Sequence, residues 1–139
     1  MKYLLDTCVL SELIKPSPNP SVIEWVNNCD ERSLFVSVLV IGEIQKGIAK
    51  LEESKKKSEL QAWLDNELVK RFKGRILNIN KKTTSIWGKL QGEAEKKGEI
   101  IPVIDALIGA TAIEHNLIVV TRNVNDIERI GAKVYNPWK

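Results

Sequence analysis

Short apolar segments alternate with helical segments along the whole chain, and this alternation limits the possible folds more than any other feature. Strands are expected at residues 2–6, 34–38, 75–80, 117–121 and 133–135, where apolar and β-branched residues stop at polar or turn-forming ones. Strands that follow one another through helices usually run parallel. The sequence therefore predicts an α/β fold, a mainly parallel sheet with helices covering both faces.

The segments between the strands carry apolar residues at helical spacing. Helices are expected at residues 9–14, 21–28, 38–51, 55–71, 81–97 and 102–116, with a helical turn at 125–130. Ser21 is expected to cap the second helix, after a proline-rich connector at 15–20, and Pro102 to occupy the first position of the sixth. Val40, Ile44 and Leu51 are expected to face the sheet from the third helix.

The length and the residue counts narrow the class of protein. A chain of 139 residues is expected to form one domain, covering residues 1–139. Its single histidine, His115, excludes the histidine pair of a metal-free ribonuclease and a histidine-rich zinc site. Any hydrolytic chemistry in this chain would therefore have to use carboxylates.

The cysteines and the apolar runs bear on the environment of the protein. Cys8 and Cys29 form no C-x-x-C pair, and both are expected to be reduced and structural. No run reaches the roughly 18 uncharged apolar residues of a membrane span, and Asp6 interrupts the N-terminal apolar run before it could serve as a signal sequence. We expect a cytoplasmic protein with no membrane partner.

The net charge of +3 is unevenly distributed. Residues 46–82 carry 11 basic and 5 acidic side chains, whereas residues 1–45 carry 3 and 6. The basic members are Lys46, Lys50, Lys55, Lys56, Lys57, Lys70, Arg71, Lys73, Arg75, Lys81 and Lys82. Such a segment could form a phosphate-binding surface or simply the solvated face of a helix.

Polar residues occur where ligands collect in parallel sheets, at the carboxyl ends of the strands. Asp6 follows the first strand and Glu43 lies on the helix after the second, while Thr121 and Asn123 follow the fourth, with Asp126 one turn further on. Each has an ordinary alternative: Asp6 could cap a helix, Glu43 could be exposed, and the residues after the fourth strand could form a turn.

Asp105 is the most unusual carboxylate. It is the only charged residue between Ile100 and Ile113, in a helix that is otherwise almost entirely apolar. Burying an unpaired carboxylate is costly, so such a residue is usually paired or bound to a metal ion. Its alternative role is interaction with the N-terminus of its own helix.

Two or three of these carboxylates in one cleft would repel each other, and a divalent cation with oxygen ligands would relieve the repulsion. Mg²⁺ or Mn²⁺ fits this set better than Zn²⁺, because it contains no thiolate or imidazole. Such an ion supports phosphoryl chemistry without histidine. The sequence does not show whether these residues come together.

The ordered motifs of the chain resemble those of the PIN-domain toxins of the VapC and FitB group. They are Leu4 to Thr7 with Leu10 to Glu12, Val40 to Ile44 around Glu43, Asp105 to Ala112, Val120 to Asn123 with Asp126, and Asn136 to Trp138. The resemblance implies a three-layer α/β/α PIN domain and Mg²⁺- or Mn²⁺-dependent RNA cleavage that leaves a 5′-phosphate. It also implies an antitoxin partner, a homodimer, and DNA binding only through the antitoxin.

Carried onto this sequence, the resemblance makes Asp6 and Asp105 the metal ligands. Glu43 would complete the coordination or orient the attacking water, and Thr7 and Thr121 would support these carboxylates through their hydroxyl groups. The sequence departs from the usual pattern at Asn123, where many relatives carry aspartate, so that Asn123 or Asp126 could fill the fourth acidic position.

Two other functions are alternatives for this sequence. The neutral Asn123 is compatible with a module that binds RNA or a partner without cleaving it. A phosphotransferase with Asp6 as nucleophile is less favoured, because Cys8 stands where phosphatases of the haloacid dehalogenase type carry a second aspartate, and no phosphate-binding G-x-x-x-x-G-K loop is present.

Overall fold

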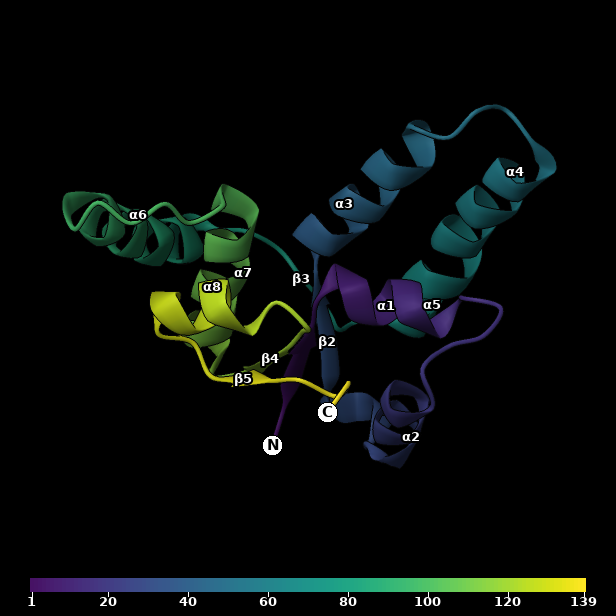
Figure 1. The fold of residues 1–139 in the computed structure, drawn as a ribbon, viewed down its shortest axis with the longest axis horizontal. Helices are drawn as coiled ribbons and strands as arrows, with labels where there is room; N and C mark the ends of the chain where they lie inside the picture. The colour runs from purple at the N-terminus through teal and green to yellow at the C-terminus, as the bar shows by residue number, and fades with distance from the viewer.

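The computed structural model describes all 139 residues, and its centre is a five-stranded sheet in the order β3-β2-β1-β4-β5 with every neighbouring pair parallel (Figure 1). The strands are β1 (Tyr3–Leu5), β2 (Leu34–Ser37), β3 (Ile76–Leu77), β4 (Ile118–Val120) and β5 (Val134–Tyr135). Each lies within a segment where the sequence predicts a strand. The prediction of a parallel sheet is confirmed.

Helices cover both faces of the sheet. They are α1 (Thr7–Leu13), α2 (Pro20–Asn28), α3 (Val38–Ala49), α4 (Lys55–Ala62), α5 (Val69–Arg71), α6 (Lys81–Lys96), α7 (Val103–His115) and α8 (Val124–Ile130). A 3₁₀ turn, Glu31–Ser33, precedes β2, and a π-helical segment, Trp63–Leu68, joins α4 to α5. The helices α1 to α5 lie on one side and α6 to α8 on the other (Figure 1), which confirms the three-layer α/β/α architecture. None of the helices combines the length and the apolar character needed to cross a membrane.

Three local expectations were wrong. Asn19, not Ser21, caps α2 by accepting from the backbone NH of Ser21 and of Val22, because Pro20 has a fixed φ and lacks an NH and so suits the first helical position. Pro102 does not occupy the first position of α7 as expected, but lies one residue before it, at the N-cap. Leu51 lies beyond the end of α3 and is partly exposed.

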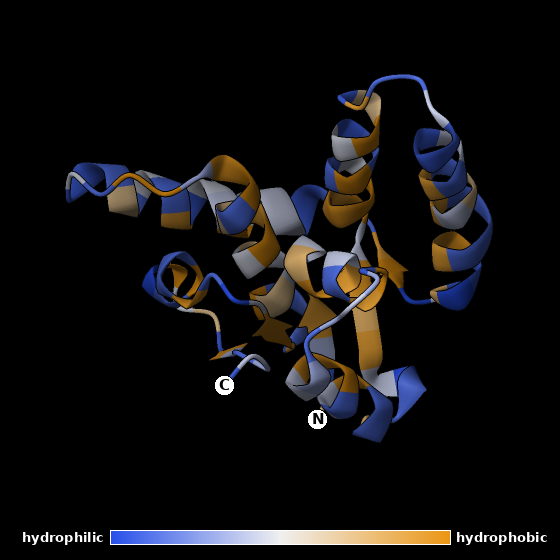
Figure 2. Cartoon of the chain, turned by 45° about the vertical axis from the view of Figure 1, so that its right-hand side comes forward, coloured by the Kyte–Doolittle hydropathy of each residue, from blue (hydrophilic) through white to orange (hydrophobic).

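The core lies between the sheet and the helices. Leu4, Val36 and Val119 are fully buried on adjacent strands, and Val40 and Ile44 are buried on α3. Figure 2 shows the strands as the most continuous apolar part of the ribbon, whereas the helices show hydrophilic residues on their outer faces. The apolar pattern of the sequence thus places β1, β2 and β4 at the centre of the sheet.

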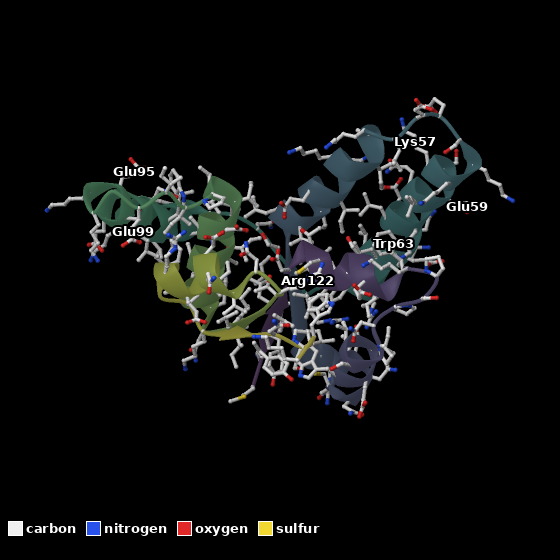
Figure 3. The ribbon with its side chains drawn as sticks, viewed as in Figure 1. Lys57, Glu59, Trp63, Glu95, Glu99 and Arg122 are labelled. Atoms are coloured by element: carbon white, nitrogen blue, oxygen red, sulfur yellow. The ribbon has the colours of Figure 1, made fainter.

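Four of the eleven basic side chains at residues 46–82, those of Lys55, Lys57, Arg71 and Arg75, pair with acidic side chains. Arg71 and Arg75 both bind the carboxylate of Glu31, at 2.9 Å and 3.0 Å, and Lys57 binds Glu53 at 2.7 Å. Figure 3 shows Lys57, a residue of α4, between the upper parts of α3 and α4. These contacts support the solvated helix face rather than a phosphate-binding surface built on Arg71 and Arg75.

The strand order positions a crevice. From β1 the chain proceeds through β2 to β3 at one edge, and then returns to the other side of β1 for β4 and β5. The connecting helices leave the carboxyl ends of β1 and β4 toward opposite faces, which opens a ligand-binding crevice at that point. The helices α7 and α8 pack closely against each other, because a side chain at Gly109 of α7 would place its Cβ 2.7 Å from Cγ2 of Ile130 in α8.

Candidate metal centre and active-site cleft

A cleft of about 450 Å³ opens at the carboxyl ends of β1 and β4. It is lined by Asp6, Thr7, Cys8, Glu43, Asp105, Arg122 and Asn123. These residues come from α1, α3, α7 and the segments after β1 and β4. The structure therefore brings Asp6, Glu43, Asp105 and Asn123 together, whereas Asp126 is not among the lining residues.

Asp6 is positioned both by its strand and by the helix that it caps. Its backbone NH donates to the carbonyl oxygen of Val120 at 3.0 Å, which continues the β1–β4 pairing by one residue. Oδ1 accepts from the backbone NH of Thr7, and Oδ2 accepts from the hydroxyl of Thr121, both at 2.8 Å. The side chain is only 7% exposed. Helix capping and a place in the cleft, which the sequence left as alternatives, thus occur together.

Glu43 reaches the cleft from the middle of α3. Its Oε1 accepts a hydrogen bond of 2.7 Å from the hydroxyl of Thr7. Because the backbone NH of Thr7 donates to Asp6, Thr7 binds both carboxylates, Asp6 through its backbone and Glu43 through its hydroxyl group. Thr7 and Thr121 therefore lie where they can support Glu43 and Asp6, respectively.

Asp105 lies in the first turn of α7 and faces a concentration of negative charge. Burial raises the pKa of its carboxyl to about 6, and the charges of Asp6, Asp126 and Glu43 contribute in the same direction. A carboxyl near the start of a helix would ordinarily be stabilised in its charged form. Burial, together with the charges of the surrounding carboxylates, outweighs that effect at Asp105.

Asn123 connects Asp105 to Asp126. Its side-chain nitrogen donates to Oδ2 of Asp105 at 3.0 Å and to Oδ2 of Asp126 at 3.2 Å, so the amide nitrogen rather than the oxygen faces the two carboxylates. Asp126 also binds Arg129 at 2.7 Å, and this hydrogen bond holds the pKa of Asp126 below its usual value. Asn123 is thus part of the cleft lining, whereas Asp126 lies outside the lining and contacts the side chain of Asn123.

Two residues of the cleft were not predicted as part of it. The Cys8 thiol lies 3.6 Å from the Thr121 hydroxyl and accepts from the backbone NH of Arg122 at 3.5 Å, and burial raises its pKa. Cys29 is also a free thiol. The position of Cys8 in the first turn of α1, two residues after Asp6, could have indicated a place in the cleft. The position of Arg122 beside Asn123 could have done the same.

The donor set fits a hard divalent cation. The cleft offers carboxylate, hydroxyl and amide oxygens, while its thiol has a raised pKa and stays protonated. No three of the Asp, Glu, Cys or His side chains are arranged to hold one ion directly. Mg²⁺ commonly binds one or two carboxylates and retains several waters, so an open cleft with two or three separated carboxylates suits it.

Comparisons with known proteins agree with this geometry. A model of the PIN domain matches residues 3–133. The chain is 33% identical over 135 residues to the toxin FitB of Neisseria gonorrhoeae, covering 97% of both chains, and 30% identical over 136 residues to the VapC ribonuclease Y4jK of Sinorhizobium fredii, covering 98% of this chain and 97% of that protein. The structure of FitAB bound to an IR36 DNA fragment superposes with a TM-score of 0.92 at 31% identity, over 99% of this chain and 96% of that one.

Proposed function

Because this chain belongs to the PIN-domain family, as a toxin of the VapC and FitB type, we propose that its acidic cleft is the metal-dependent centre of a ribonuclease. The protein is the toxin of a toxin–antitoxin pair and an endoribonuclease that cleaves RNA phosphodiester bonds. The metal dependence and the role of each residue are the content of the proposal.

The charge around Asp105 supports the proposal most directly. Asp6, Glu43 and Asp105 line one cleft, and the pKa of Asp105 is raised to about 6 by burial and further by the charges of Asp6, Asp126 and Glu43. Charge repulsion of this kind destabilises the protein unless a cation is bound or a proton is taken up. A divalent ion is therefore a natural occupant of the cleft.

We assign the residues as follows. Asp6 and Asp105 would hold a Mg²⁺ or Mn²⁺ ion, with Glu43 completing the coordination or orienting the attacking water. Thr7 and Thr121 hold the carboxylates of Glu43 and Asp6 through their hydroxyl groups. When bound, the ion would lower the pKa of a water and stabilise negative charge on the phosphate oxygens.

The fourth acidic position would be shared. Asn123 contributes a neutral amide at the cleft, and Asp126 contributes a charge that Arg129 offsets. A function limited to binding RNA would be motivated by the neutral Asn123, but the other three carboxylates still meet in the cleft. No observation therefore favours binding without cleavage.

The partners follow from the same family. The protein binds an antitoxin, as the structurally similar complexes do, and some of those complexes are bound to DNA. For this chain we propose DNA binding only through the antitoxin, a homodimeric toxin, and a single PIN domain over residues 1–139. We place the protein in the cytoplasm, where its RNA substrate and its antitoxin would be.

Metal removal tests the proposal. The purified toxin, free of antitoxin, should cleave RNA in Mg²⁺ or Mn²⁺, lose this activity in EDTA, and regain it when Mg²⁺ is added in excess. The thermal unfolding profile in EDTA shows whether the chain stays folded. Undiminished cleavage by a folded protein in EDTA would contradict a metal-dependent centre.

A further inference from the structure

Arg122 differs from every other arginine of the chain, because it has no acidic partner. The other four each bind a carboxylate: Arg32 binds Asp30, Arg71 and Arg75 bind Glu31, and Arg129 binds Asp126. Arg122 lines the same cleft as Asp6, Glu43 and Asp105, yet forms no ion pair with any of them. An exposed guanidinium beside several carboxylates would normally pair with one of them, so something must keep it apart.

Trp138 provides that restraint. The guanidinium carbon of Arg122 lies 4.7 Å from the centroid of the Trp138 ring, within the range of a cation–π interaction. The backbone that carries this ring is held in place, since the backbone NH of Trp138 donates to the side chain of Asn136 at 2.9 Å and the hydroxyl of Ser21 donates to the carbonyl oxygen of Pro137 at 2.7 Å. The C-terminal Asn136-Pro137-Trp138 segment thus holds Arg122 at the mouth of the cleft.

A second hollow of about 430 Å³ begins on the other side of Arg122. Arg122 and Asn123 line both hollows, and the second is completed by Val124, Asn125, Asn136, Trp138 and Lys139. Its amide groups can bind base edges, and its cationic groups can bind phosphates. Figure 3 shows Arg122 near the middle of the molecule, far from Lys57 and Glu59 on α4.

We propose that the RNA strand runs from the acidic cleft across Arg122 into this C-terminal hollow, and that Arg122 binds a phosphate next to the one that is cleaved. A guanidinium matches a phosphate through two parallel hydrogen bonds, and here its donors are not used by a carboxylate. Trp138 is a positioning residue that acts through Arg122. This inference rests on the proposed ribonuclease function and adds the path of its substrate.

RNA affinity measured without cleavage tests the path separately from the chemistry. A fluorescein-labelled single-stranded RNA would be titrated with the full-length toxin in Ca²⁺ instead of Mg²⁺, and binding followed by fluorescence anisotropy. Arg122→Gln should raise the Kd about tenfold and reduce the slope of log affinity against log salt by about 0.7, as expected for one lost phosphate contact. Arg122→Lys keeps the charge but not the planar guanidinium, so its Kd should lie between those of the wild type and of Arg122→Gln.

Arg32→Gln is the matched control. It removes the same charge from a side chain that is 89% exposed and that precedes β2, at the end of the sheet opposite the cleft. It should leave the Kd and the salt slope unchanged. Equal effects of Arg32→Gln and Arg122→Gln would show that only net charge matters and would overturn the inference.

A double-mutant cycle tests the role of Trp138. Trp138→Leu should weaken RNA binding in the wild-type background, Trp138→Phe should largely restore it, and Trp138→Leu should have no further effect in the Arg122→Gln background. Thermal unfolding of each variant identifies a general loss of stability, which would weaken binding equally in both backgrounds and would contradict the positioning role.

The outcomes separate the two proposals. If the toxin cleaves RNA and Arg122→Gln changes neither the Kd nor the KM, the proposed function stands and the RNA path is wrong, leaving Arg122 to a protein ligand. If binding depends on Arg122 but no RNA is cleaved in Mg²⁺ or Mn²⁺, the path stands and the proposed function is wrong.

Discussion

Two clusters of charged residues in this molecule have opposite character. The Glu31 cluster is formed by Glu31, Arg71 and Arg75, and its two guanidinium groups surround one carboxylate. The pKa of Glu31 is lowered, and the hydrogen bond from Arg71 is the largest cause. In the cleft, burial and then the charges of several surrounding carboxylates raise the pKa of Asp105 to about 6. Both clusters join distant parts of the chain. Compensated charge indicates a structural role, and uncompensated charge indicates a binding site.

Removing the cleft carboxylates should have the largest effect on activity. Asp6→Asn and Asp105→Asn should each reduce the initial rate of RNA cleavage by about a hundredfold or more, because each removes a negative ligand of the proposed ion. Glu31→Gln removes the same charge from the other cluster and should leave the rate unchanged. A folded Asp105→Asn variant with wild-type activity would remove the distinction between the clusters.

Metal affinity should depend on pH in the range where Asp105 titrates. With a pKa of about 6 in the metal-free protein, the carboxyl is mostly protonated at pH 5 and must lose its proton before it can bind an ion. Calorimetric titration with Mn²⁺ should therefore show about tenfold weaker binding at about pH 5 than at about pH 7. An affinity that does not change over this interval would place the ion away from Asp105.

The stability of the metal-free protein should respond to Asp105 in the same pH range. A raised pKa means that the folded state favours the protonated carboxyl, so its contribution is fully present below about pH 4 and is lost as the pH rises through about 6. Asp105→Asn should therefore stabilise the protein in EDTA at neutral pH. Solvent screening at this half-buried position limits the gain to about 1 kcal/mol.

Urea denaturation of the wild type and of Asp105→Asn, at acidic and at neutral pH in EDTA, measures this difference. The unfolding free energy of Asp105→Asn should increase relative to that of the wild type as the pH rises. A constant difference in unfolding free energy between the two proteins would show that the folded state does not raise the pKa of Asp105.

Removing the charge of the Glu31 cluster should change the unfolding free energy in the opposite direction, as a loss of stability, and by a smaller amount. Glu31→Gln leaves Arg71 and Arg75 without a carboxylate, and Arg75 is only 16% exposed. Because Glu31 itself is about half exposed, the expected loss is about 0.5–1 kcal/mol, which urea denaturation at neutral pH can detect. The lowered pKa of Glu31 places its contribution above the usual pKa of a glutamate, so the loss should diminish as the pH falls below about 4. An increase in stability would show that the arginines were strained by the pair.

The local pattern of the sequence was sufficient for the fold, because strands and helices depend on apolar spacing and on turn residues. The parallel sheet and the helices on both faces follow from that pattern. The π-helical segment at Trp63–Leu68 did not follow, since neither its residue types nor their spacing differ from those of an α-helix. The cap at Asn19 was missed for a local reason, the preference of Pro20 for the first helical position.

The members of the site were predictable to the extent that they follow strands or interrupt apolar helices. Asp6, Glu43 and Asp105 could be singled out from their positions relative to the strands and the apolar helices, and the resemblance to PIN-domain toxins added Thr7. The contact partners of Asp126 and Arg122 could not be predicted from the sequence. The pairing of Asp126 with Arg129 and the stacking of Arg122 on Trp138 depend on side-chain directions that tertiary packing sets. The basic excess at residues 46–82 was visible in the sequence, but the pairing of Arg71 and Arg75 with Glu31 was not.

The position of the bound ion tests the central claim most directly. Crystals of the toxin grown with Mn²⁺, measured for anomalous scattering, should show a peak in the cleft, bonded to carboxylate oxygens of both Asp6 and Asp105. An anomalous peak at another place on the surface, or a cleft that stays free of Mn²⁺ at concentrations that support RNA cleavage, would contradict the account.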